Sequence, residues 1–300
     1  MASSQLCDRH IQTPFATTVH LLVTLFLAAS YIPQLIQIAT NDRRGTAGIS
    51  GWYIILLTVS ASTHFAARTN NDRSAGAWKC FQDNELEGFD LFSALVVFFQ
   101  AFIHWTAAII LMILFVLFRT KTSPGNDKGD REYYTTSSPS NTAILAIVLT
   151  HAAITLPLAF YFLQDITRGT DIASSVINIL YSLFLWVSGF LTSLMACIPQ
   201  IHLLVARPRD QDGSLSTLSL GLQALAFTAL ACSQGWRMRP LPVPPTADNL
   251  FPPVILWSRE WWGKFFFEGL AFGWMALGLS QLVVLFVAIG VGARGGYIPL

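Results

Sequence analysis

Seven uncharged stretches separate the few charged residues of this chain. Only 12% of the 300 residues are charged and 53% are hydrophobic, so the charged fraction is about half that of an ordinary soluble domain. A helix needs about 20 residues to cross the hydrocarbon core of a bilayer, and each stretch is longer than this. The sequence therefore predicts an all-α membrane protein with seven transmembrane helices, within residues 14–41, 45–67, 91–118, 141–164, 172–206, 213–236 and 269–293.

A short motif occurs twice in the chain. Ile32-Pro33-Gln34 returns 166 residues later as Ile198-Pro199-Gln200, and Ile49-Ser50 returns at the same distance as Leu215-Ser216. Each copy lies in an apolar stretch that is followed by a short link with arginine and then by another apolar stretch. Internal repeats of this kind indicate a duplicated structural unit. We therefore expect two copies of one three-helix unit.

The fourth stretch, 141–164, has no counterpart at this distance. Two three-helix units joined directly would point in opposite directions across the membrane, and one extra crossing makes them parallel. Parallel repeats are a known transporter arrangement, so we expect a 3+1+3 layout with 172–206 as a single tilted helix. The predicted parts are a polar N-terminal tail (1–13), a first repeat (14–118), a polar loop (119–140), a linker helix (141–164), a second repeat (172–293) with a Pro/Trp-rich link (237–263), and a C-terminal tail (294–300).

The charges and cysteines limit the partners and the chemistry. The net charge is +1 and no block of Lys or Arg is long, which argues against nucleic acid as a partner. The lipid bilayer is the expected partner. Nine Lys and Arg fall on each predicted face of the membrane, so the positive-inside rule leaves the orientation open. Cys7 and Cys80 would share one face, where a bridge is possible, although we expect two unpaired thiols.

The two Pro-Gln motifs, with Gly48-Ile49-Ser50 after the first, resemble those of the PQ-loop repeat proteins. This family includes cystinosin, the vacuolar amino acid exporters, the SWEET sugar carriers and the KDEL receptor, and the likeness is closest to fungal PQ-loop proteins. It covers roughly residues 14–118 and 172–293. The resemblance implies a lumenal or extracellular N-terminus, a cytosolic C-terminus and a solute path between the two three-helix bundles.

The resemblance also implies roles for single residues. Pro33 and Pro199 would act as hinges for alternating access, and Gln34 and Gln200 beside them would line the path. The C-terminal Tyr297-Ile298-Pro299-Leu300 resembles the tail signal that directs cystinosin to lysosomes, which favours a vacuolar membrane.

The chain departs from the family pattern in two places, and the second departure bears on proton coupling. Ser214 stands where the second motif would have glycine, and residues 215–236 lack the acid that cystinosin-like carriers place in this helix. Glu268 is the only acid at the edge of an apolar stretch. An ionisable residue at membrane depth is expensive to bury and indicates function. Glu268 therefore either couples transport to protons or lies at the interface beside Lys264.

Further polar residues lie within the predicted spans. His20, His104 and His151 can each relay protons or form an ordinary hydrogen bond between helices. His104 is the first candidate because Gln100, one turn earlier, shares its helical face. Asn178 and Gln223 are either ligands or interhelical contacts. Neither a metal nor a cofactor is expected, since no histidine pair has the spacing of metal ligands and no cofactor motif is found.

These patterns predict a transporter that carries a small polar solute, such as an amino acid or a similar metabolite, with protons as a candidate coupling ion. Two alternatives stay open. A receptor or sorting protein with the same fold would bind its ligand without net flux. A membrane enzyme such as a terpene cyclase would need acids to protonate its substrate, and a single marginal glutamate is a poor supply. We therefore do not expect an enzyme.

Overall fold

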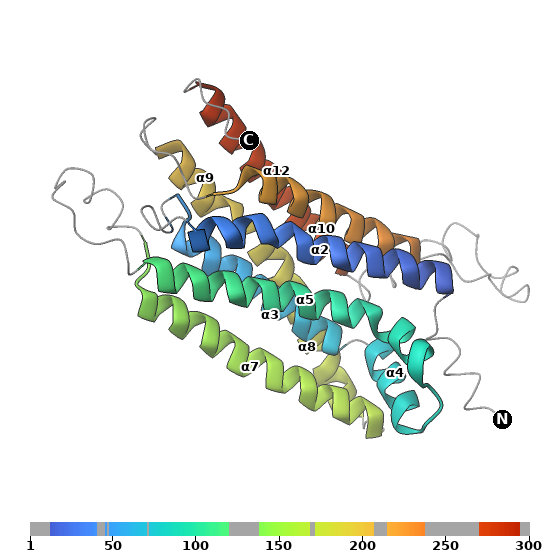
Figure 1. Ribbon diagram of the computed structural model, residues 1–300. Helices are drawn as coiled ribbons and strands as arrows, with labels where there is room; N and C mark the ends of the chain where they lie inside the picture. The colour runs from blue at the N-terminus through green and yellow to red at the C-terminus, as the bar shows by residue number, and fades with distance from the viewer. Residues whose placement is uncertain are drawn as a thin grey trace, which may run out of the picture.

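The computed structural model describes residues 13–40, 46, 48–70, 72–119, 138–168, 172–206, 215–237 and 270–294. Within these ranges the chain is all-helical, as predicted, and contains no strand (Figure 1). The helices are α2 (Pro14–Thr40), α3 (Gly51–Thr69), α4 (Asp72–Gln82), α5 (Gly88–Arg119), α7 (Asn141–Arg168), α8 (Ile172–Met195), α9 (Cys197–Ala206), α10 (Thr217–Arg237) and α12 (Leu270–Arg294).

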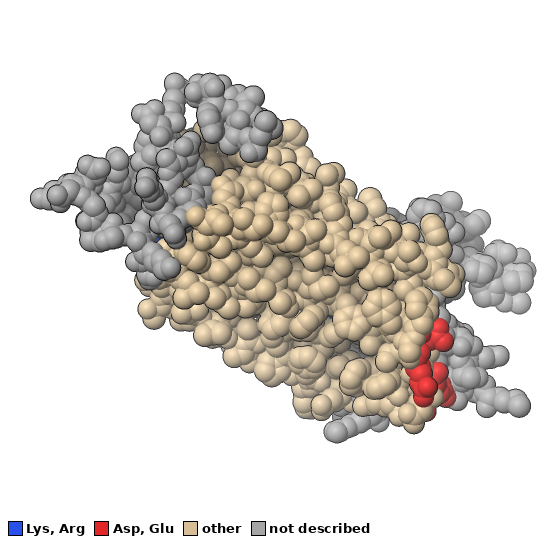
Figure 2. Space-filling model, in the orientation of Figure 1, with Lys and Arg blue, Asp and Glu red and all other residues tan. Residues whose placement is uncertain are grey.

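Five stretches of helix in the described part of the chain are long and apolar enough to cross a membrane. They are Pro14–Thr40, Gly88–Arg119, Asn141–Gln164, Val176–Ala206 and Ala271–Val291. Their outer faces are apolar; Leu180 on α8, for example, is 60% exposed. Figure 2 shows that acidic side chains gather near α4, at one end of the molecule, while the described residues across the middle of this face are uncharged. The five helices fit an integral, multi-pass membrane protein.

The other two predicted spans correspond to α3 and α10, which are less apolar. In α3, 15 of 19 residues are buried, and they include serines, threonines, His64 and Arg68. A helix enclosed by other helices does not meet the lipid, so it can carry polar side chains that hydrogen-bond to its neighbours. The low hydropathy of α3 therefore reflects its enclosed position.

The helices that carry the two sequence copies pack in matching ways. We call α2, α3 and α5 the first repeat, and α8, α9, α10 and α12 the second repeat. In the first, α5 packs against both α2 and α3; in the second, α12 packs against both α8–α9 and α10. Between the repeats, α3 packs against α8 and α9, while α10 packs against α2 (Figure 1). Each repeat therefore places its middle helix against the first helix of the other.

The predicted helix over 172–206 is one candidate span, Val176–Ala206, but it is interrupted at Ala196. Helix α8 ends at Met195, and α9 begins at Cys197. Pro199 explains the break, because proline lacks an N–H and its ring collides with the carbonyl four residues earlier, which is that of Met195. Pro33 lies at the equivalent place in the first repeat, yet α2 continues through it.

Two further features differ from the sequence predictions. The predicted link between α3 and α5 contains α4, a short polar helix that packs against α5 and α7. Cys80, on α4, is disulfide-bonded, so the expectation of an unpaired thiol there is wrong; Cys197 and Cys232 are free thiols. Cys7, Glu268, the Pro/Trp-rich link over 238–263 and the C-terminal tetrapeptide lie outside the described residues.

Replacing Gly278 by valine is expected to destabilise the fold at the α10–α12 contact. A Cβ atom there would lie 3.2 Å from Thr228 Oγ1 and 3.5 Å from the Ala224 carbonyl oxygen, and overpacking costs about 1–3 kcal/mol. Gly290→Val on the same helix is the control, because no described atom lies within 4 Å of a Cβ at that position. The free energy of unfolding in detergent micelles is the measurement. Equal losses for the two variants would contradict the close packing of α10 and α12.

Candidate functional site between the two repeats

The two Pro-Gln glutamines form reciprocal hydrogen bonds between the repeats. Gln200 Oε1 accepts the Ser50 backbone N–H at 2.9 Å, and its Nε2 donates to the Gly48 carbonyl at 2.7 Å. Gln34 Oε1 accepts the Ser216 backbone N–H at 2.8 Å. Ser50 is the N-cap of α3, and Ser216 immediately precedes α10. Because the first N–H groups of a helix lack partners within it, each glutamine caps the middle helix of the opposite repeat.

Gly48 gives the first cap its shape. Its φ of 88° lies in the left-handed region, which glycine adopts without steric cost. This conformation accompanies the backbone turn that presents the Gly48 carbonyl to Gln200. The Gly-Ile-Ser sequence therefore forms one half of the contact and the Pro-Gln sequence of the other repeat forms the second half.

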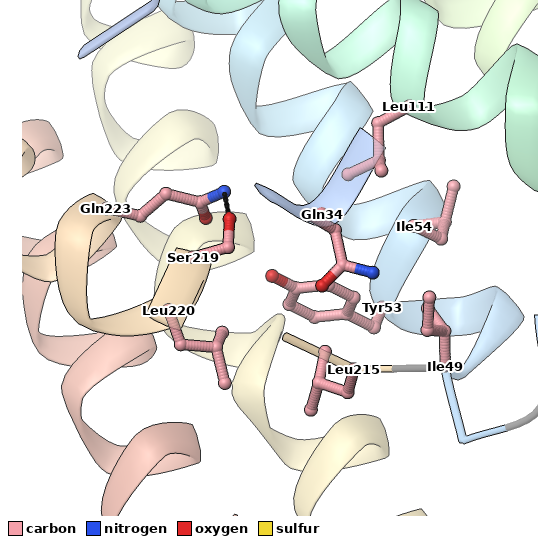
Figure 3. A pocket seen from close by; sticks show the side chains of 9 residues that line it. All are labelled: Gln34, Ile49, Tyr53, Ile54, Leu111, Leu215, Ser219, Leu220 and Gln223. Carbon is pink, nitrogen blue, oxygen red and sulfur yellow. Dashed lines mark hydrogen bonds between the residues drawn. The ribbon is translucent and has the colours of Figure 1, made fainter. Parts of the chain in front are cut away.

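A small cavity lies beside the glutamine contacts (Figure 3). Its volume is about 10 Å³, close to what a single water molecule needs. Ser219 Oγ donates to the Ser30 carbonyl at 2.7 Å, and Gln223 Nε2 donates to Ser219 Oγ at 3.1 Å. Gln223 Oε1 is buried without a hydrogen-bond partner in the described part of the chain. The lining residues are Gln34, Ile49, Tyr53, Ile54, Leu111, Leu215, Ser219, Leu220 and Gln223.

Farther along the interface, six helices, three from each repeat, each contribute one buried side chain to a set that we call the central cluster. All six side chains are at most 4% exposed. They are Tyr31 on α2, His64 on α3, His104 on α5, Ser193 on α8, Phe227 on α10 and Trp274 on α12.

Hydrogen bonds and ring contacts hold the central cluster together. The Tyr31 hydroxyl lies 2.7 Å from His104 Nδ1, and His64 Nε2 lies 3.2 Å from Ser193 Oγ. The His64 ring stacks on Trp274 with centroids 5.3 Å apart. His104 meets Trp274 edge-on at a centroid distance of 5.2 Å. Two imidazoles and an indole thus meet where the repeats face each other.

Gly273 allows His64 to reach this position. A Cβ atom at Gly273 would lie 1.9 Å from His64 Cε1, closer than any real contact. The glycine therefore lets the imidazole lie directly against the backbone of α12, beside Trp274. Gly273 is a positioning residue for the central cluster.

Amide side chains join the repeats at the end opposite the Pro-Gln motifs. Asn70, which follows α3, donates to Asn178 Oδ1 at 2.6 Å and to Ser182 Oγ at 2.9 Å on α8. Gln234 on α10 donates to Gln100 Oε1 on α5 at 3.2 Å. Polar contacts therefore connect the repeats at both ends and through the middle.

The structure separates residues that the sequence grouped together. Gln100 and His104 are both buried on α5, but Gln100 binds His20 on α2 and Gln234, whereas His104 binds Tyr31. His151 on α7 lies 3.0 Å from Thr63 Oγ1, outside the central cluster. No group of three His, Cys, Asp or Glu suited to a metal occurs among the described residues.

The sequence prediction missed the roles of His64, Ser193 and Trp274. His64, which the sequence analysis did not single out, falls near the end of the predicted span 45–67, yet it contacts Ser193 on α8 and Trp274 on α12. Trp274 resembled the many aromatic residues of an apolar span. A usable signal was present in Gly273, since a glycine beside a tryptophan in a helix indicates close approach by another group.

No protein-family model, curated protein or solved structure matches this chain. The likeness to PQ-loop proteins consequently rests on the two motifs and their spacing.

Leucine in place of Gln200 or Gln34 is expected to lower the free energy of unfolding by about 1–3 kcal/mol, because the capped N–H group then lacks its partner. Gln82→Leu, at an exposed position at the end of α4, is the control for removing an amide. Equilibrium unfolding in mixed micelles measures the difference. If all three variants unfold alike, the contacts between repeats do not stabilise the fold.

Alanine at Gly273 should displace His64 and reduce thermal stability, whereas Gly290→Ala should not, since alanine favours the helix. The second change His64→Ala removes the clashing ring, so the double variant should recover part of the loss. The measurement is the melting temperature of the wild type, Gly273→Ala, Gly290→Ala and the double variant. Failure of His64→Ala to compensate would show that the Gly273 loss has another cause.

Proposed function

We propose that this chain is a transporter, and not an enzyme, which moves a small polar solute by alternating access between two parallel three-helix repeats. In this proposal α3 and α10 also cross the membrane, giving seven spans in the 3+1+3 layout of PQ-loop proteins. The reciprocal capping of α3 and α10 by Gln200 and Gln34 is the observation that carries the proposal. It joins the two motif copies in a symmetric contact at one end of the interface between the repeats.

The distribution of polar contacts supports alternating access. The glutamine contacts close one end of the interface, the Asn70 and Gln100 contacts close the other, and the central cluster lies between them. Each hydrogen bond contributes a net ~0.5–1.5 kcal/mol, so opening one end costs little while the other end stays closed. Pro33 and Pro199 stand beside the glutamines, where a helix bends most readily.

Cys80 supports the proposed orientation. Disulfides persist in oxidising compartments, and Cys80 lies on α4, at the same end as Asn70. This end would face the lumen or exterior together with the N-terminus, and the glutamine contacts would face the cytosol. A vacuolar membrane follows from the C-terminal tetrapeptide and is part of the proposal.

Transport is tested by tracer uptake into proteoliposomes, first with pooled amino acids and then with sugars. A variant with Asn70→Cys and Asn178→Cys, made on a Cys197→Ser/Cys232→Ser background, places thiols where the repeats meet. Oxidation should reduce uptake to the level of empty liposomes, and reduction should restore it. Each single-cysteine variant and the parent are carried through the same treatment.

Two results would overturn this reading. Uptake that persists after full cross-linking would exclude relative movement of the repeats at this end. Ligand binding without uptake of any tracer would favour the alternative of a receptor or sorting protein with the same fold.

Proton coupling is assigned by comparing Glu268→Gln with His104→Gln under an imposed pH gradient. The coupling residue is expected to lose the stimulation by the gradient while exchange of labelled for unlabelled solute continues. If both variants keep the stimulation, neither residue couples protons.

A further inference from the structure

Two ring nitrogens in the central cluster lack hydrogen-bond partners in the described part of the chain. They are His104 Nε2 and Trp274 Nε1, and both side chains are 0% exposed. Buried polar atoms nearly always have a partner, so each exception needs an explanation. These two exceptions belong to rings that touch each other, with centroids 5.2 Å apart.

Both nitrogens are hydrogen-bond donors. The indole nitrogen always carries a hydrogen. The Tyr31 hydroxyl is buried, and among the described residues His104 Nδ1 is its hydrogen-bond partner. Donation from the hydroxyl to Nδ1 satisfies both groups, and we assign the hydrogen of the neutral imidazole to Nε2 on this ground. Two N–H groups, on rings that contact each other, thus remain without an acceptor in the described part of the chain.

The two donors belong to different repeats. His104 is on α5 and Trp274 is on α12, the third helix of each repeat. A movement that separates the repeats would part these rings and open a space with a donor on each wall. A molecule bound there would connect the two repeats through its own acceptor atoms.

The charges around the cluster favour an anion. The acidic side chains whose burial the structure describes are all exposed (Asp83, Glu85, Glu87 and Asp90), whereas Arg68 is buried, at 7% exposed. Arg68 follows His64 by one turn on α3. A cation near a site of low dielectric constant offsets the cost of burying a negative charge.

We infer that the central cluster binds the carboxylate group of a small solute, with one hydrogen bond from His104 Nε2 and one from Trp274 Nε1. An ionised carboxylate only accepts hydrogen bonds, and bonds to an ionised group are the strong ones. An amide or a sugar would bring hydrogens of its own, which need acceptors. This inference rests on the proposed function and narrows the solute to small carboxylic acids, amino acids among them.

Paired ligands test the inference on the full-length protein in detergent. The carboxylates L-alanine, lactate and acetate are compared with L-alaninamide, lactamide and acetamide, and glucose is included, by the shift in melting temperature as each ligand is titrated. At least one carboxylate should stabilise the protein and its amide should not. Stabilisation by an amide or by glucose alone, or by no carboxylate, overturns the inference.

Variants that keep the ring shapes locate the site. Trp274→Phe should weaken carboxylate binding roughly 10- to 100-fold, the effect of one hydrogen bond to a charged group. His104→Asn, which keeps a polar group near Tyr31 but none at Nε2, should do the same. Trp105→Phe is the matched control, because that indole already donates to Ser62 Oγ on α3 at 3.1 Å. Unchanged carboxylate binding in Trp274→Phe overturns the inference.

The two proposals fail in different ways. Uptake of sugars or amides but not of carboxylates would refute the carboxylate site and leave the transporter in place. Carboxylate binding that Trp274→Phe weakens, without uptake of any solute, would refute transport and leave the site.

Discussion

The capping of each middle helix by the opposite repeat is the contact on which the rest of the structure depends. Helices α3 and α10 begin at the interface between the repeats, where their first N–H groups lack partners within the helix. Gln200 and Gln34 supply the missing acceptors, and an unsatisfied buried donor would cost about 1–3 kcal/mol. The opposite repeat thus supplies part of the capping of each middle helix, beside local caps such as Ser216 Oγ, which accepts the Ser219 N–H. The two sequence copies form one structural unit although only α7 connects them along the chain.

The enclosed position of α3 explains where the polar residues lie. Lipid requires apolar side chains on the outer helices, so polar chemistry is confined to surfaces where helix meets helix. His64, Ser60 and Thr63 on α3 all contact residues of other helices. The path proposed for the solute follows the same surfaces. The lower hydropathy of α3 thus agrees with its enclosed position among the other helices.

The sequence predicted a helical chain, because long apolar stretches are strong signals, and it singled out the two glutamines that bind across the repeats. It could not predict which faces of the helices meet, since nearly every face of a membrane helix is apolar. His64 and Trp274 are far apart in sequence and stack only because α3 and α12 both line the interface. The break before Pro199 was missed for another reason: Pro33 occupies the same place and leaves α2 intact. Whether proline interrupts a helix depends on packing that is not visible in the motif.

This difference between the two prolines makes the repeats mechanically unequal. Gln34 is carried on a continuous helix of 27 residues, whereas Gln200 is carried on α9, a segment of only 10 residues beyond a break. A short helical segment beyond a break changes direction at a lower energetic cost than a long continuous helix does. The second repeat therefore has a break beside its glutamine that the first repeat lacks. The two motif copies thus make matching hydrogen bonds from helices of unequal length.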